Sequence, residues 1–147
     1  MKRASLIPLL MLCFSLPIFA QKALVFTNAE GAIHGYDPVA YFKEGKALKG
    51  NPTLSYDWRG ASWHFASQDN LTAFQASPEK FAPQFGGYCA YGMSKGYKAP
   101  TDPQAWTIVD DKLYLNYNLD VKELWNKKQA EHIKTADKNW PTVSQQE

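Results

Sequence analysis

The stretch LSYDWRGASWHFAS, residues 54–67, gives the first indication of the fold. Aromatic side chains stand on both sides of Arg59-Gly60, a dipeptide suited to a tight turn, and this pattern predicts a β-hairpin. Side chains alternate along a strand, so Trp63 and Phe65 share one face while His64 lies on the other. If Trp63 and Phe65 fill the core, His64 points at solvent or a groove; if they do not, His64 is buried beside the helices.

Short helices are predicted on either side of this hairpin. Ser67 can cap a helix over residues 68–76, and Ser77-Pro78 can begin a second one that carries Phe81. Upstream, Asp37-Pro38 combines an acceptor side chain with a proline that needs no amide partner, and it predicts a helical turn ending near Phe42.

A second hairpin is expected in WTIVDDKLYLNY, residues 106–117, which alternates around Asp110-Asp111. Two hairpins interleaved with short helices predict an α+β fold with mostly antiparallel pairing. The length predicts one compact domain. About 127 residues remain after a leader, and a chain of this length forms a single core more readily than two.

The C-terminal part predicts one long helix. Asp120 is placed as its cap, Glu123 completes a capping box, and Leu119 can close on Leu124 as a hydrophobic staple. The apolar stripe of this helix extends to Trp140, and we expect it to lie against the sheet.

The chain begins with a pattern typical of a secretory leader. Lys2 and Arg3 precede an apolar run that ends at Ala20 and is too short to span a membrane. We therefore expect a secreted or periplasmic protein without a membrane span after cleavage. The predicted organisation is a signal peptide (1–20), an N-terminal arm (21–32), the domain (33–141) and a loose polar tail (142–147).

Charge and cysteine content exclude several classes of protein. The precursor has 16 basic and 14 acidic residues, and removal of Lys2 and Arg3 leaves 14 of each, so nothing indicates nucleic acid as a partner. Only Cys89 remains once the leader with Cys13 is gone, so no internal disulfide can form. We expect a monomer, although an unpaired thiol in an oxidising compartment also allows an intermolecular disulfide.

Several motifs together resemble a known family. The segments GYDPVAYF, YDWRGASWHFAS, NLTAFQASPEKFAPQFGGYCAYG and DPQAWTIVDDKLYLNYN, with a lysine-rich helix ending in NWP, are similar to bacterial secreted YHS-domain proteins. The resemblance covers residues 33–141. It implies a compact α+β module related to small treble-clef-like domains that are thought to hold soft metals through cysteines.

The resemblance also shows what this chain lacks. In the metal-binding members a cysteine follows the Asp-Pro-Val opening, and two more lie near the end of the Phe-Cys-Ser strand and in the next helix. The corresponding positions here hold Ala40, Ala66 and Asn70. A metal site, if present, must therefore be built elsewhere.

Cys89, in FGGYCAYGMSKG (85–96), is the remaining soft ligand. Thiolate, imidazole and thioether groups suit copper before zinc, so Cys89 is our anchoring candidate, with Met93, His64 and His34 as further metal ligands. The alternative for Cys89 is a small buried hydrophobe beside a tight turn. His64 has a structural alternative within the sheet, and His34 one as an exposed loop residue.

Two other functions remain open. A binding module for a small molecule or protein would use aromatic side chains around the glycine-rich loop. The candidates for this ligand site are Tyr36, Tyr41, Tyr88, Tyr91, Tyr97 and Trp106. A cysteine enzyme would need a histidine base beside Cys89 and backbone amides freed by Gly86-Gly87, but no spacing fixes a third partner. We expect a binding protein and not an enzyme.

Overall fold

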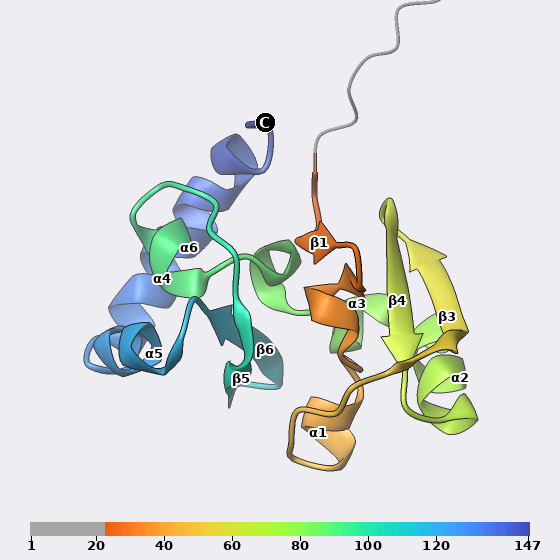
Figure 1. The fold of residues 1–147 in the computed structure, drawn as a ribbon. Helices are drawn as coiled ribbons and strands as arrows, with labels where there is room; N and C mark the ends of the chain where they lie inside the picture. The colour runs from red at the N-terminus through yellow and green to blue at the C-terminus, as the bar shows by residue number, and fades with distance from the viewer. Residues whose placement is uncertain (1–22) are drawn as a thin grey trace, which may run out of the picture.

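The computed structural model describes residues 23–147, and the predicted signal peptide lies outside this range. The described chain has the predicted α+β architecture (Figure 1). Its strands are β1 (Thr27–Asn28), β2 (Gly31–Ala32), β3 (Asn51–Trp58), β4 (Ala61–Phe65), β5 (Asp102–Val109) and β6 (Lys112–Asn116). Its helices are α1 (Ala40–Lys43), α2 (Gln68–Ala76), α3 (Pro78–Phe81), α4 (Ala90–Ser94), α5 (Leu119–Asn126) and α6 (Gln129–Val143), with 3-10 turns η1 (Ile33–Gly35) and η2 (Gln84–Gly87).

Within residues 23–147 the strands pair as three separate antiparallel hairpins: β1 with β2, β3 with β4, and β5 with β6. Both hairpins predicted from the sequence are confirmed, since Trp58 pairs with Ala61 and Val109 with Lys112. The two residues at each turn have positive φ, the backbone of tight hairpin turns. These residues are Arg59, Gly60, Asp110 and Asp111.

Strand β6 divides the core into two parts. Leu113 and Leu115 belong to a first cluster with the β3–β4 hairpin and α2, whereas Tyr114 belongs to a second cluster with α4, α5 and α6. Alternation along the strand places these side chains on opposite faces. Trp63 and Phe65 are fully buried in the first cluster, so the face that they share is the one that enters the core.

The predicted helix beginnings after the first hairpin are confirmed. Ser67 accepts a hydrogen bond from the Asn70 backbone N–H at 3.1 Å, and α2 covers residues 68–76. Helix α3 begins with Pro78 at its first position and buries Phe81.

The predicted long C-terminal helix is confirmed as α6, but the residues before it form a separate helix, α5. Asn118 caps α5 by accepting from the Val121 N–H at 2.8 Å, so Asp120 is not the cap. The staple is also wrong, because Leu119 and Leu124 are 56% and 45% exposed. The chain turns at Lys128, whose φ of −140° is not helical. No helix within residues 23–147 is long and apolar enough to cross a membrane.

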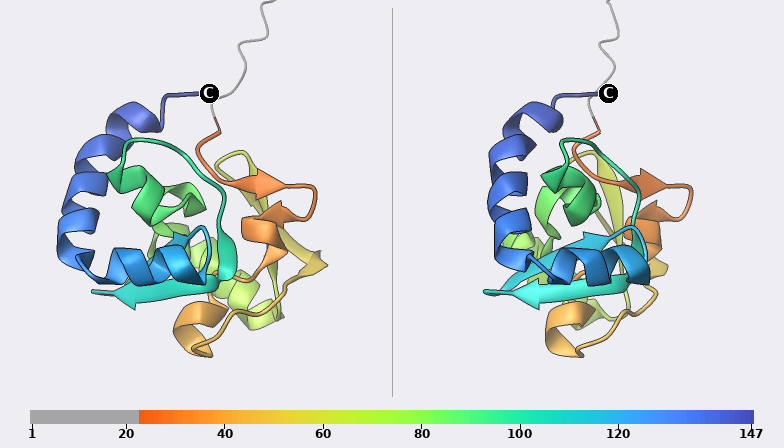
Figure 2. Two further views of the ribbon diagram at one scale, coloured as in Figure 1. Left: turned by 60° about the vertical axis from the view of Figure 1, so that its left-hand side comes forward. Right: turned by 90° about the vertical axis from the view of Figure 1, so that its left-hand side faces the viewer.

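Helix α6 packs mainly against α4 (Figure 2), and its Ala136 shares the second core cluster with Tyr114 of β6. Asn139 Nδ2 donates to the Met93 carbonyl at 3.0 Å. The Ser94 hydroxyl donates to the Tyr91 carbonyl at 2.6 Å, so it accepts from His132 Nδ1, 3.2 Å away. Burial, with a smaller effect of Lys95, lowers the pKa of His132, which favours the neutral ring in this contact.

The predicted N-terminal arm is part of the fold where it is described. Val25 is 3% exposed, and the Phe26 N–H donates to the Gly86 carbonyl at 2.9 Å. This approach requires glycine at 86, since a Cβ there would lie 1.8 Å from the Leu24 carbonyl oxygen.

The chain's last residues are not a loose tail throughout. Val143 belongs to α6 and is 4% exposed. Lys98 Nζ donates to the carbonyls of Ala23 (3.1 Å) and Gln146 (2.6 Å). The two ends of the described chain therefore share one side-chain contact.

Replacing Gly86 with alanine tests the docking of the arm. Gly45→Ala is a matched control, because Gly45 has nearly the same φ (+64° against +63°) and no atom within 4 Å of a built Cβ. Gly45→Ala should cost about 1 kcal/mol of unfolding free energy from φ alone. Gly86→Ala should cost about 2 kcal/mol more and speed hydrogen exchange at the Phe26 amide. Equal losses in urea unfolding of the two variants would contradict close packing at Gly86.

Candidate functional site

A pocket of about 270 Å³ opens beside α4, the loop after it and the start of α5. It is lined by Cys89, Tyr91, Tyr97, Ala99, Tyr117 and Val121, and we call it the Cys89 pocket. Three residues predicted for the site, Cys89, Tyr91 and Tyr97, thus come together. Tyr117 and Val121 were missed because the sequence placed them in a hairpin end and a helix face, with nothing to link either to the glycine-rich loop.

Cys89 is the N-cap residue of α4 and is 2% exposed. Its backbone N–H donates to the Ala99 carbonyl at 2.9 Å, and its sulfur accepts from the Gly92 N–H at 3.4 Å. Asn116 Oδ1 lies 3.6 Å from the sulfur and also accepts from the Tyr91 N–H at 3.0 Å. The thiol is therefore fixed at the base of the pocket by contacts from α4 and β6.

The surroundings of Cys89 have two opposing effects on the pKa of its thiol. Burial raises the pKa of the thiol, while the backbone N–H groups of Gly92, Tyr117 and Tyr91 oppose this effect. The protonated thiol can donate to Asn116 Oδ1. A metal ion that binds the sulfur must displace this proton, and the thiolate then retains the nearby N–H donors.

The Asn116 side chain has one unpaired end. The Tyr91 N–H donates to Oδ1, and this bond fixes which end of the Asn116 amide is the oxygen. Asn116 is fully buried, and its Nδ2 has no partner within residues 23–147. Such a buried donor costs about 1–3 kcal/mol and is rare in native proteins. Here it belongs to the side chain that contacts the thiol.

Met93 follows Cys89 by one turn of α4, a short helix in the segment that the glycines led us to expect as a loop. Its backbone N–H donates to the Cys89 carbonyl at 2.8 Å. The Met93 side chain is fully buried in the second core cluster and is not part of the pocket lining. Its surroundings are those of a packing residue.

The structure does not bring His64 to Cys89. Figure 1 shows β4, which carries His64, and α4 on opposite sides of the molecule. The His64 ring lies against η1 and β2: a Cβ built on Gly35 would be 3.1 Å from His64 Nδ1, and one built on Gly31 would be 3.1 Å from Nε2. A shared ligand set of Cys89 and His64 is therefore wrong, because each packs in a different part of the fold.

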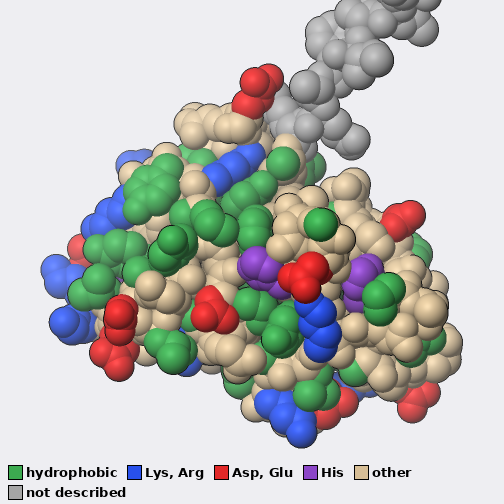
Figure 3. All heavy atoms as spheres, in the orientation of Figure 1, with side chains coloured by type: hydrophobic (Ala, Val, Ile, Leu, Met, Phe, Trp, Pro, Cys, Tyr) green, Lys and Arg blue, Asp and Glu red, His purple; other side chains and the backbone are tan. Residues whose placement is uncertain are grey.

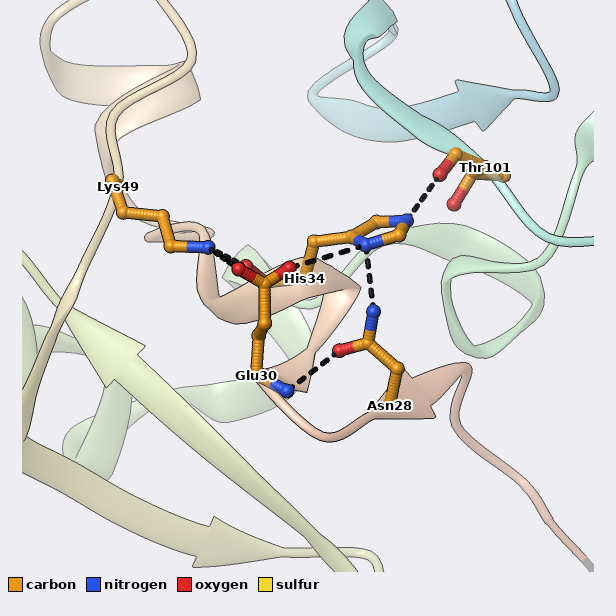
Figure 4. A network of polar contacts seen from close by, with 5 residues as sticks. All are labelled: Asn28, Glu30, His34, Lys49 and Thr101. Atoms are coloured by element: carbon orange, nitrogen blue, oxygen red, sulfur yellow. Dashed lines mark hydrogen bonds and ion pairs between the residues drawn. The ribbon is translucent and has the colours of Figure 1, made fainter.

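His34 belongs to a separate polar network (Figure 4). Its Nε2 lies 2.8 Å from the Thr101 carbonyl, and its Nδ1 lies 2.7 Å from Asn28 Nδ2. Because a carbonyl only accepts, Nε2 carries the hydrogen and Nδ1 accepts from Asn28. The Glu30 N–H donates to Asn28 Oδ1 at 2.9 Å and fixes this amide orientation.

In this arrangement His34 joins η1 to the chain just before β5. Lys49 completes the network, with Nζ 2.9 Å from Glu30 Oε1, and this contact lowers the pKa of Glu30. Both ring nitrogens of His34 are engaged, so neither has a lone pair directed at a metal. The predicted role of His34 as a ligand gains no support from this geometry.

The other predicted aromatic residues do not line the Cys89 pocket. Lys49 Nζ lies over the Tyr36 ring, 5.3 Å from the ring centroid. The Tyr41 ring packs 5.3 Å from Trp106, and its hydroxyl donates to the Pro103 carbonyl at 2.9 Å. The Tyr88 hydroxyl donates to the Ala23 carbonyl at 3.0 Å. These rings pack and tie segments together, and the predicted single aromatic site is wrong for them.

The three positions at which the family resemblance implies cysteines lie around one buried carboxylate. Asp37 is fully buried. Its Oδ2 accepts from the Ala66 N–H (2.8 Å) and Asn70 Nδ2 (2.7 Å), and its Oδ1 accepts from the N–H groups of Val39 (2.8 Å) and Ala40 (3.2 Å). Ala40, Ala66 and Asn70 are thus neighbours in space, and hydrogen bonds now occupy the place where thiolates would meet.

No group of three or more His, Cys, Asp or Glu side chains within residues 23–147 is arranged to hold a metal ion. The pocket at Cys89 offers one sulfur and three phenol groups. A metal bound there would have one protein thiolate and open positions for other ligands.

Exposed aromatic and aliphatic side chains gather near this pocket. Tyr97 and Tyr117, in the lining, are 50% and 52% exposed, and Leu119 and Leu124 on α5 are similarly open. Figure 3 shows hydrophobic side chains grouped over the half of the molecule formed by α4, α5 and α6. The pocket therefore opens onto an apolar surface.

The fold around the Asp37 cluster is a small α+β module. In comparison with known families, residues 39–85 match the YHS domain. Metal binding is attributed to this family in general. The match runs from α1 to the first half of η2 and ends before Cys89. Neither the curated proteins nor the solved structures gave a match to the chain.

Asp37→Asn tests the carboxylate at the former cysteine positions. The substitution keeps the shape but gives one oxygen in place of two, so an NH₂ group faces donors that were satisfied before. We expect a loss of about 3 kcal/mol of unfolding free energy, measured by urea unfolding. Asp69→Asn on the exposed start of α2 is the control and should cost less than about 0.5 kcal/mol. Similar midpoints for both variants would show that Asp37 does not organise this region.

Proposed function

We propose that this chain is an exported, non-enzymatic binding protein that takes a soft metal ion, Cu(I) before Zn²⁺, at the Cys89 pocket. The observation that carries the proposal is the position of the Cys89 sulfur at the base of an aromatic pocket, among the backbone N–H groups of Gly92, Tyr117 and Tyr91. The YHS domain at residues 39–85 supports metal binding in general. The leader-like sequence at 1–20 supports export.

The donor set favours copper over zinc. Thiolates are soft ligands that select Cu(I), whereas structural zinc sites close with four N or S ligands. The pocket supplies one thiolate, and its remaining walls are tyrosine rings, alanine and valine. Such a site would leave coordination positions for an exchanging small thiol or a partner's ligand, which suits transfer of the ion more than permanent storage.

The arrangement around Cys89 supports binding more than catalysis. A cysteine nucleophile needs a base within hydrogen-bond reach. His64 and His34 have their contacts in other parts of the fold, and His132 contacts Ser94 and Tyr91. With a raised pKa, the Cys89 thiol is a weak nucleophile at neutral pH.

A Cu(I) competition titration tests the proposal on the reduced, metal-free chain from residue 21 to 147. We expect one ion per chain in the wild type and loss of this binding in Cys89→Ser. Because one thiol proton must leave, the apparent affinity should rise about tenfold per pH unit below the thiol pKa. Zn²⁺ in place of Cu(I) should bind more weakly.

Met93→Leu and His64→Ala are the matched controls. Leucine replaces methionine at nearly equal volume, so the fold should persist. Both variants should bind Cu(I) within about threefold of the wild type if Cys89 alone supplies the protein's ligand. If Cys89→Ser binds Cu(I) as tightly as the wild type, the proposal is wrong.

A second candidate is a small organic ligand in the same pocket. The specific observation is the three-tyrosine lining together with the exposed apolar side chains beside it. Tyr117→Ala separates the two candidates, because it removes an aromatic wall but no sulfur ligand. Loss of binding of the apolar dye ANS in Tyr117→Ala, with no Cu(I) binding in the wild type, would favour the organic ligand.

A further inference from the structure

A second cleft lies between the YHS domain and the C-terminal half. Its volume is about 210 Å³, and it is lined by residues from β3 and the turn after it, α3, η2 and α6. The side chains that matter here are Trp58, Arg59, Glu79, Gln84, Asp137 and Trp140. None of them lines the Cys89 pocket. Ligand sites are common where two parts of a fold meet in this way.

One wall of the cleft already holds an organic cation. The Arg59 guanidinium lies over the Trp58 ring, 4.3 Å from its centroid. The same group places Nη2 3.0 Å from Glu79 Oε1. An aromatic face and a carboxylate thus hold a guanidinium between them, by cation–π attraction and a charge-assisted hydrogen bond.

The α6 side of the cleft also carries an aromatic ring and a carboxylate. Asp137 and Trp140 stand three residues apart on α6, a spacing that makes them neighbours on a helix surface, and both line the cleft. The Trp140 ring also meets Phe85 at 6.1 Å, which anchors it. Among the residues that the structure describes, the Asp137 carboxylate makes no hydrogen bond or ion pair.

We propose that this cleft binds an alkylammonium or alkylguanidinium group, held by Trp140 and Asp137 as Arg59 is held by Trp58 and Glu79. The charge of the lining agrees, because Arg59 contributes +1 and Glu79 and Asp137 contribute −2, which leaves −1. Gln84 adds an amide for a ligand N–H. The cation can come from a free amine or from an arginine or lysine of a partner protein, and the chemistry at the cleft is the same.

NMR titrations of the ¹⁵N-labelled chain test the proposal, with the Trp140 indole signal, assigned through Trp140→Phe, as the readout. The probes are agmatine, N-acetyl-arginine-N-methylamide and the neutral citrulline analogue of the latter. We expect saturable shifts with at least one of the two cations and none with citrulline. Asp137→Asn should weaken binding about tenfold, because it removes the charge and keeps the shape. Asp69→Asn, far along the chain on exposed α2, should leave it unchanged.

The two cations distinguish the sources. Binding of agmatine indicates a free small cation, and binding of the blocked arginine alone indicates a side chain of a partner protein. The proposal is overturned if neither cation shifts the Trp140 signal, if citrulline binds as well as arginine, or if Asp137→Asn binds like the wild type. Unfolding midpoints of all variants establish that each is folded, and the result does not depend on Cu(I) binding at Cys89.

Discussion

The buried carboxylate of Asp37 is the constraint on which the first half of the structure depends. Four N–H donors meet its two oxygens, from the start of α1, the end of β4 and the side chain of Asn70 in α2. A buried charge is tolerable only when its hydrogen bonds are satisfied, and these four come from three different stretches of chain. The carboxylate thereby fixes the hairpin, the first helical turn and α2 relative to one another.

The same carboxylate joins the three positions at which the family resemblance implies cysteines. Thiolates around a metal would join the three positions now held by Ala40, Ala66 and Asn70. Here hydrogen bonds to Asp37 join them, and no ion is needed for the connection. The C-terminal half then adds a second core behind β6, with Cys89 and Asn116 on the side of that strand that faces α4. Cys89 thus lies in a pocket that opens onto the surface, apart from the hydrogen-bonded centre at Asp37.

Local patterns were enough to predict most of the first half of the fold. The alternation around Arg59-Gly60, the Ser67 cap and Pro78 depend on neighbours in sequence, and the structure follows them. The C-terminal helix shows the limit of such patterns, because Asn118 and Asp120 are both good caps and the contacts of α6 with α4 decided where the chain turns. Leu119 and Leu124 have the spacing of a hydrophobic staple, but both side chains are exposed, and the local sequence does not show this.

The candidate site was harder to predict because its parts are distant in sequence. Cys89, Tyr91 and Tyr97 lie on one segment and were grouped correctly, but Asn116 and Tyr117 reach the thiol only through the pairing of β5 with β6. The two histidines were misjudged for the same reason. His64 packs on Gly31 and Gly35, and His34 bonds to Asn28 and Thr101, but these distant contacts cannot be recognised from the sequence. What separates Cys89 from them is its setting, a sulfur with backbone donors on one side and an aromatic opening on the other. A residue packed only for stability would not need that opening.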